Sequence, residues 1–114
     1  MTGPGGPLAG TEWIVVELPG GGVARDAPPT LAFAEDGRVH GFGGVNRLAG
    51  GYAVEGDLVT IGPLAMTRMA GPAEQMDQEH RFAAALEGPL SFALAGDALT
   101  LGEVRLVRAT VPSA

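Results

Sequence analysis

Short runs of alternating apolar and polar residues, separated by glycine-containing turns, constrain this chain more than any other feature. In the last third, Leu90, Phe92 and Leu94 alternate with small residues. The alternation resumes after Gly96–Asp97 and again after Gly102–Glu103. Successive side chains of a strand point to opposite faces of its sheet. The pattern therefore predicts a three-stranded antiparallel meander with one buried face.

Further strands are predicted in the first half of the chain, where β-branched and aromatic residues gather between turn signals. These strands cover residues 13–18, 31–35, 38–42, 52–54 and 58–61. Asp36–Gly37 suits a two-residue hairpin turn, because such turns need positive φ angles. Glu55–Gly56–Asp57 predicts a second hairpin in the same way.

One helix is predicted, beginning at Gly71–Pro72 and ending before Gly88–Pro89. Proline suits a first helical turn because no partner awaits its missing N–H there, and glycine commonly ends a helix. The apolar stripe at helical spacing comprises Met76, Phe82, Ala83 and Leu86. We therefore expect a mainly β (α+β) fold, a small antiparallel β-barrel-like sheet with one packed α-helix.

The length of 114 residues fits a single domain. We expect a flexible N-terminal arm at 1–10, the folded domain at 11–109 and a frayed tail at 110–114. The chain has no cysteine, which excludes disulfides and thiolate metal sites. A net charge of −6 disfavours phosphate backbones, so we expect no nucleic-acid partner.

Two features bear on cellular location. No apolar run approaches the roughly 18 residues of a membrane span, and the N-terminus lacks the basic start and apolar stretch of a signal peptide. We expect a cytoplasmic protein; the alternative is a secreted or lipid-anchored protein whose leader has been removed. All seven basic residues are arginine, which we attribute to a GC-rich bacterial genome.

One long segment carries a family likeness. Residues 43–69 read GGVNRLAGGYAVEGDLVTIGPLAMTRM, TEW precedes them at 11–13, and the helix ends with FAAAL at 82–86. Together these motifs resemble the META domain, also called the HslJ-like family, from Trp13 to about Val107. The resemblance implies a small, barrel-like, mostly β fold with a helix packed on it, and an association with heat-shock and stress responses.

The resemblance also draws attention to two positions. The family motif usually reads Gly-Cys-Asn-Arg, whereas this chain has Val45 in place of the cysteine. A second family cysteine usually follows Thr-Arg-Met, where this chain has Gly71. The paired loss implies that Val45 and Gly71 are neighbours in space. A cysteine-free variant suits a reducing compartment, where disulfides do not persist.

A polar cluster in the family motif is the candidate binding site. Its members are Asn46, Arg47, Thr67, Arg68 and Glu79. On a functional interpretation the cluster lies at the surface and binds an acidic group through the arginine forks. On a structural interpretation Asn46 tolerates an unusual backbone angle in a bulge, and the arginines pair with acids such as Glu79. We favour the structural interpretation, which fixes the helix against the sheet.

Other site chemistry finds little support. The two histidines, His40 and His80, are too few for a zinc site without a third ligand. Ser91 lies in a predicted strand without a nucleophile-elbow motif, and Ser113 lies in the tail. The glycines at 41–44 lack the spacing and the lysine of a phosphate loop. We expect no catalytic residue, no metal and no cofactor.

The leading hypothesis is a non-enzymatic, stress-associated binding or interaction module, with a packed interior and its function on the outer face. We expect Trp13 to anchor the core and Met66, Met69 and Met76 to fill it. The alternative is a carrier of a small apolar ligand, which requires an apolar pocket of roughly 300 Å³ between helix and sheet. A hydrolase is less favoured and requires a histidine within hydrogen-bond reach of Ser, Asp or Glu. The expected partner is a protein or a small ligand, and an open sheet edge would allow a weak dimer beside the monomer.

Overall fold

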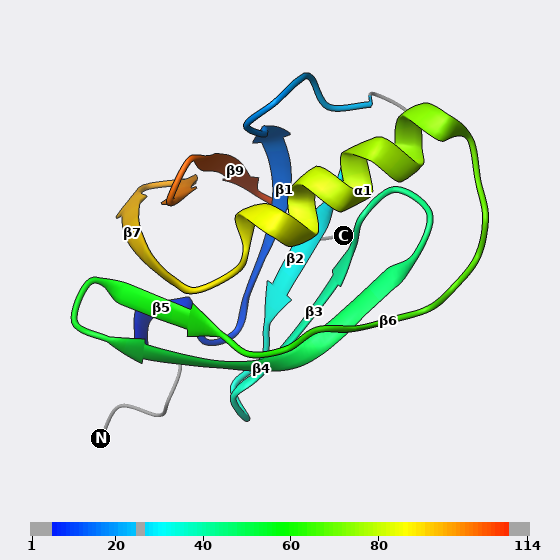
Figure 1. Cartoon of the computed structure of the whole chain (residues 1–114). Helices are drawn as coiled ribbons and strands as arrows, with labels where there is room; N and C mark the ends of the chain where they lie inside the picture. Colours follow the sequence, from blue (N-terminus) through cyan, green and yellow to red (C-terminus); the bar gives the residue numbers. More distant parts are fainter. Residues whose placement is uncertain (1–5, 25–26, 110–114) are drawn as a thin grey trace, which may run out of the picture.

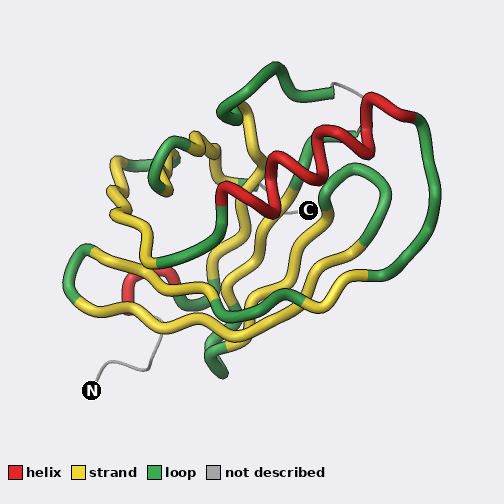
Figure 2. Tube along the Cα trace, viewed as in Figure 1, coloured by secondary structure: helices red, strands yellow, loops and turns green. Residues whose placement is uncertain are grey.

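The computed structural model describes residues 6–24 and 27–109, which fold into nine strands, one α-helix and a short 3₁₀ helix. Figures 1 and 2 show the strands wrapped around a common interior with the helix across one end. In chain order the elements are η1 (Gly6–Leu8), β1 (Thr11–Glu17), β2 (Thr30–Phe33), β3 (Arg38–Phe42), β4 (Arg47–Glu55), β5 (Leu58–Ile61), β6 (Ala65–Met66), α1 (Ala73–Ala85), β7 (Pro89–Ala95), β8 (Ala98–Leu101) and β9 (Val104–Arg108).

The sheet closes on itself as an eight-stranded antiparallel barrel. The strand order is β3-β2-β1-β9-β8-β7-β5-β4-β6, and an additional pairing of β3 with β4 completes the circle. The ninth strand, β6, pairs with the first half of β4 and lies outside the circle. The predicted fold class, a mainly β barrel with one packed helix, is confirmed.

Glycine sets the geometry of three hairpins. Gly56, Gly96 and Gly102 each open a two-residue turn with a positive φ of 64°, 62° and 54°. A turn with glycine in this first position matches the right-handed twist of the strands that it joins. These turns are where the sequence places them.

The turn between β2 and β3 differs from its prediction. Ala34 N–H donates to Arg38 C=O at 2.8 Å, so the loop holds three residues rather than two. Only Gly37 has a positive φ, of 86°, while the Asp36 carboxylate accepts from Arg38 N–H at 3.0 Å. A three-residue loop ending in a left-handed glycine needs one positive φ angle where the expected turn needs two.

The strand β4 is longer than predicted and pairs with three other strands. Its residues 47–51 pair with β3, and its residues 52–55 pair with β5. Gly50 lies at this change, where an added Cβ would approach Pro63 C=O at 3.0 Å. Because Gly50 has no side chain, the connection from β5 to β6 passes close to β4. β6, a short strand that the sequence did not predict, then pairs with β4.

Apolar side chains fill the barrel. The core comprises Leu8, Trp13, Val15, Leu18, Leu31, Phe33, Val39, Leu48, Tyr52, Val59, Ile61, Phe82, Leu86, Leu99, Leu101, Val104 and Leu106. Trp13 is the predicted core anchor, and its indole N–H donates to Thr11 Oγ1 at 2.8 Å. The prediction for the methionines is wrong at two positions, since Met66 is 37% and Met69 54% exposed. Both lie on β6 or just after it, outside the barrel wall.

The expected flexible arm is wrong for residues 6–10. η1 buries Leu8 completely, and Gly10 N–H donates to Phe33 C=O at 2.7 Å. Residues 1–5 of the arm and the predicted tail at 110–114 lie outside the described residues. In the described part of the chain, no helix has the length and apolar character needed to cross a membrane.

Replacing Leu8→Ala should lower the free energy of unfolding by about 2–5 kcal/mol, because the change leaves a cavity in the core. Urea unfolding followed by tryptophan fluorescence measures the loss. The matched control is Val16→Ala, which truncates an exposed residue of β1 and should change stability by less than about 0.5 kcal/mol. Equal stability of Leu8→Ala and the parent protein would contradict the burial of η1.

Tyr52 should make stability depend on pH in the alkaline range. Burial, and then the charges of Asp36 and Glu35, raise the pKa of its phenol above the usual 10.0. The folded protein holds this proton more tightly than the unfolded chain does, so the stabilisation is complete below pH 10 and is lost as pH rises through the raised pKa. The phenol also donates to Ala34 C=O at 2.7 Å. Tyr52→Phe should cost about 1 kcal/mol at neutral pH and flatten the alkaline decline.

Tyr52 is the one tyrosine of the chain, so ultraviolet titration of the folded protein reports its ionisation alone. A phenol that titrates at the value of free tyrosine would count against this account.

Candidate functional site

The loop between β3 and β4 lies directly beneath α1 and meets the segment that leads into the helix (Figure 1). A Cβ added to Gly71 would lie 2.6 Å from Val45 Cγ2. The two positions that the family resemblance marks are therefore neighbours in space, as predicted. Val45 fills the place that a side chain at position 71 would need.

A buried carboxylate holds this loop to the helix. Glu79 and Asn46 are each only 3% exposed. Glu79 Oε2 accepts from the backbone N–H of Val45 at 3.0 Å and also from that of Asn46. Glu79 Oε1 accepts from Asn46 Nδ2 at 2.7 Å. Three N–H donors thus replace the water that the carboxylate loses on burial.

The side-chain amide of Asn46 uses its full hydrogen-bonding capacity. Its Nδ2 donates to Glu79 Oε1 and to Met69 C=O, at 2.7 and 3.0 Å. Its Oδ1 accepts from Thr67 Oγ1 at 2.9 Å and from Met69 N–H at 2.6 Å. Because Met69 presents a backbone donor and a backbone acceptor, only one orientation of the amide satisfies all four partners. Asn46 therefore joins the β3–β4 loop, the segment after β6 and the helix.

Two glycines make this approach possible. A Cβ on Gly43 would clash with Glu79 Cγ, and one on Gly44 would come within 2.7 Å of Gln78 Nε2. Gly44 also has a φ of 129°, and no non-glycine residue among those described has a positive φ. The expected unusual angle at Asn46 is therefore wrong. Gly44 provides the backbone geometry, and Asn46 provides the hydrogen bonds.

The arginines do not pair with Glu79, contrary to the structural interpretation. Arg47 and Arg68 are exposed, and backbone and amide N–H groups supply the hydrogen bonds to the carboxylate. Within the described residues, the side-chain ion pairs join Arg81 to Asp77, Arg105 to Glu17 and Arg108 to Asp97. The predicted cluster therefore divides into two parts: a network in which exposed Thr67 bonds to buried Asn46 and Glu79 holds Asn46, and two surface arginines.

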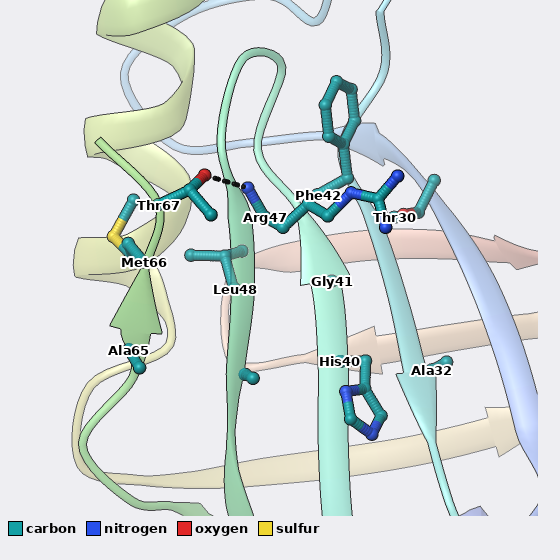
Figure 3. Close-up of a pocket in the computed structure, with 11 residues that line it drawn as sticks. Thr30, Ala32, His40, Gly41, Phe42, Arg47, Leu48, Ala65, Met66 and Thr67 are labelled. Carbon is teal, nitrogen blue, oxygen red and sulfur yellow. Dashed lines mark hydrogen bonds between the residues drawn. The ribbon is translucent and has the colours of Figure 1, made fainter. Parts of the chain in front are cut away.

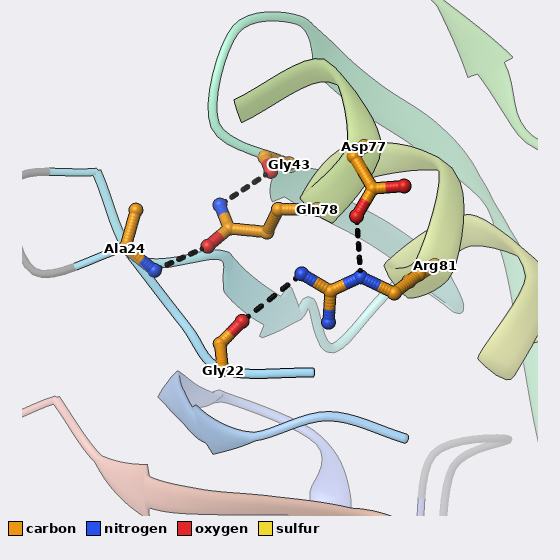
Figure 4. Close-up of polar contacts among 6 residues, drawn as sticks. All are labelled: Gly22, Ala24, Gly43, Asp77, Gln78 and Arg81. Atoms are coloured by element: carbon orange, nitrogen blue, oxygen red, sulfur yellow. Dashed lines mark hydrogen bonds and ion pairs between the residues drawn. The ribbon is translucent and has the colours of Figure 1, made fainter. Parts of the chain in front are cut away.

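Two neighbours of Glu79 on the helix fix a second loop, which the sequence analysis did not identify (Figure 4). Gln78 Nε2 donates to the carbonyls of Gly43 and Ala27, both at 2.9 Å, and its Oε1 accepts from Ala24 N–H at 2.6 Å. Arg81 forms an ion pair with Asp77 at 2.9 Å and donates to Gly22 C=O at 3.0 Å. Polar residues on a helix usually face solvent, so the sequence carries no signal for these contacts.

A hollow on the outer face of the barrel is lined by residues of β2, β3, β4 and β6, among them Arg47, and by Thr67 (Figure 3). Its volume is about 690 Å³, and it opens to solvent. Strand register explains its shape, because Ala32, His40, Ala49 and Ala65 form one row across β2, β3, β4 and β6. The adjacent row holds Thr30, Phe42 and Arg47. The small side chains of the three alanines leave the hollow, and the larger side chains of Phe42 and Arg47 border it on one side.

A second hollow, of about 460 Å³, lies between the connection from β5 to β6 and the C-terminal end of α1. Its apolar lining includes Leu64, Met66 and Leu86, and Glu87 and Gly88 stand at the helix end. Its volume exceeds the roughly 300 Å³ expected of a carrier's pocket. It is nevertheless open to solvent and has the Glu87 carboxylate at its edge, whereas a ligand pocket buries most of its ligand's surface.

The described residues place no catalytic set around the histidines. His40 lines the outer hollow and His80 is exposed on α1, and neither forms a hydrogen bond with a described Ser, Asp or Glu. Ser91 is exposed on β7, and Ser113 lies outside the described residues. No group of three or more potential metal-ligating side chains occurs in the part of the chain that the structure describes.

Comparison with known proteins gives a family and a fold. The sequence matches the META domain over residues 6–111. A solution NMR structure of a protein from Burkholderia xenovorans superposes with a TM-score of 0.75 at 24% identity, covering 91% of this chain and 85% of that one. A second NMR structure gives 0.71 at 21% identity, covering 95% of each chain. A comparison with curated proteins gave no significant match.

Replacing Glu79→Gln should lower the free energy of unfolding by about 1–3 kcal/mol, because a carboxamide cannot accept all three hydrogen bonds. If the oxygen of this carboxamide accepts from the two backbone N–H groups, its NH₂ faces the NH₂ of Asn46, and two donors lie opposite each other. The Asn46 amide cannot flip to relieve this, because it would lose its hydrogen bonds to Met69. Chemical denaturation measures the difference. Glu103→Gln, an exposed change of the same kind in the turn between β8 and β9, should alter stability by less than about 0.5 kcal/mol. Similar effects of the two changes would show that the buried carboxylate contributes no special stability.

Proposed function

This chain belongs to the META domain family, and we propose that it is a non-enzymatic binding module that uses the outer face of its barrel. The observation that carries the proposal is the contrast between a filled interior and a hollow outer surface. Trp13, Phe33 and Phe82 are fully buried in the core, whereas the hollow of about 690 Å³ over β2, β3, β4 and β6 is open. An eight-stranded barrel whose side chains fill its interior has no room for a ligand there.

The lining of the outer hollow favours an acidic group attached to an apolar body. The guanidinium of Arg47 has no ion-pair partner among the described residues, and its planar fork suits a carboxylate. Phe42 and the three alanines offer apolar contact beside it, and Thr30 adds a hydroxyl group. The Thr67 hydroxyl is already bonded to Asn46 and to Arg47 N–H. A terminal carboxylate, or an acidic side chain next to an apolar residue of a partner protein, has this combination.

Two other functions are less well supported. A carrier would need an enclosed apolar chamber, whereas the hollow beside α1 is open and has the Glu87 carboxylate at its edge. A hydrolase would need His40 or His80 beside a nucleophile or a carboxylate, and the described residues provide no such contact. A role in stress responses belongs to the proposal through the family resemblance alone. A cytoplasmic location belongs to it because the chain has no cysteine, which suits a reducing compartment.

NMR titration with N-acetylphenylalanine tests the outer hollow, because this probe joins a carboxylate to an aromatic body. We expect the amide signals of Ala32, His40, Ala49 and Ala65 to shift. N-acetylphenylalaninamide, which lacks the charge, should shift them less at equal concentration. Arg47→Gln should weaken binding of the acid by roughly two- to fivefold, the range for one exposed charged contact.

Arg38→Gln is the matched control. Arg38 lies on β3 and is exposed, as Arg47 is on β4, but it does not line the hollow. It should leave the titration unchanged. Equal binding of the acid and the amide, or equal effects of the two arginine changes, would refute the proposed site. Hydrolysis of ester substrates that disappears in His40→Ala would refute the non-enzymatic assignment.

A further inference from the structure

The barrel closes around eight strands, but β6 leaves one sheet edge free. In the strand order β6 stands at the end, with β4 as its one partner among the described strands. All the other strands have neighbours on both sides, since β3 and β4 pair to close the circle. Residues 65–74, which include β6 and lead into α1, are exposed throughout. An open edge of this kind is a template on which a further strand can form.

The register shows which backbone groups face the free edge. Leu48 pairs with Met66, and Thr67 N–H donates to Arg47 C=O at 3.1 Å. In an antiparallel ladder, hydrogen-bonded and non-hydrogen-bonded pairs alternate along the strand. Since Thr67 bonds to β4, the N–H and C=O of Met66 point the other way. The backbone of β6 therefore presents a donor and an acceptor to the space beside it.

That space is a groove rather than open solvent. β5 and β6 both run along β4, and β7 occupies the position next to β5 from Pro89 onward. On the N-terminal side of Pro89, Gly88 connects β7 to the end of α1. No described strand therefore occupies the corresponding position next to β6. The hollow of about 460 Å³ between Ile61–Met66 and the helix end lies here. It has the place and direction of a missing strand.

The groove also has a preferred chemistry. Leu64 and Met66 on one side, and Ala83 and Leu86 on the other, offer apolar contacts. The C-terminal end of a helix carries partial negative charge, and the last turn of α1 contains no basic residue to offset it. Glu87 adds a full negative charge at the same end. An incoming strand with a basic side chain near Glu87 would be favoured there.

We propose that the free edge of β6 binds an extended segment of a partner protein as an added strand, with apolar side chains in the groove and a basic one beside Glu87. The main-chain bonds to Met66 fix the segment in place, and the groove and Glu87 select its side chains. The net charge of −6 argues against a second copy of this chain as the occupant, because two acidic molecules repel each other. This site does not include Arg47, although Met66 lines both the groove and the outer hollow.

The probe is a capped seven-residue peptide of alternating valine and threonine with one central lysine. On titration we expect the NMR signals of residues 64–68 to shift and the exchange of the Met66 amide hydrogen to slow. A peptide with N-methylated alternate amides cannot form the ladder and should cause no such shift. A peptide with glutamate in place of lysine should bind at least about threefold more weakly, because its negative charge is repelled by that of Glu87.

Met66→Pro removes the N–H that faces the free edge and leaves the bonds to β4 in place, since proline is tolerated on the open side of an edge strand. It should weaken binding of the lysine peptide by about fivefold or more. Met66→Ala shortens the side chain but keeps the N–H, so it should bind more tightly than Met66→Pro. Slow exchange of the Thr67 amide hydrogen in both variants verifies that β6 still pairs with β4.

Three outcomes would overturn the proposal. The first is the absence of any shift at residues 64–68 at millimolar peptide. The second is equal binding of the N-methylated peptide. The third is a mass by light scattering that doubles with concentration in the parent protein and not in Met66→Pro, which would assign the edge to a second copy. Arg47→Gln should leave binding of the lysine peptide unchanged, so a failure of the outer hollow and a failure of this edge are distinguishable.

Discussion

The buried carboxylate of Glu79 is the interaction on which the arrangement of this domain depends. A lone helix laid across the end of a barrel has little to fix its rotation or its position along its axis, because apolar contacts are not directional. Glu79 supplies direction, since its oxygens accept from the backbone of Val45 and Asn46 and from the Asn46 amide. Moving the helix by one turn would leave a buried charge without donors. The cost would be several kcal/mol, which is comparable to the free energy of unfolding of a small domain.

The same network positions the surfaces that we assign to binding. Asn46 accepts from Met69 N–H and donates to Met69 C=O, which holds the segment after β6 in place. Thr67 connects that segment to the start of β4, where Arg47 emerges on the outer face. The buried network thus keeps one side of β6 paired while its other side stays open beside the helix end. Rigid support beneath an exposed edge lowers the ordering cost when a partner binds.

Parts of the site were accessible from the sequence and parts were not. The resemblance marked Val45 and Gly71 as neighbours, and the close contact between them confirms it. It also grouped Asn46, Thr67 and Glu79, which the structure joins in one network. The expected partnership of Glu79 with Arg47 or Arg68 failed, because charge alone suggests an ion pair and cannot reveal that backbone N–H groups lie closer. Gln78 gave no signal, since an amide on a helix looks the same whether it meets solvent or a loop.

By itself the sequence determined the local structure: alternating strands, glycine-first turns, one helix and the absence of thiol chemistry. Each of these follows from the composition or from steric effects between residues that are close together in the sequence. Only the tertiary structure decided that β3 and β4 close the barrel, that Leu8 belongs to the core and that β6 keeps a free edge. These outcomes depend on contacts between distant segments, whose choice is set by how side chains fill a shared volume and which buried polar groups find partners.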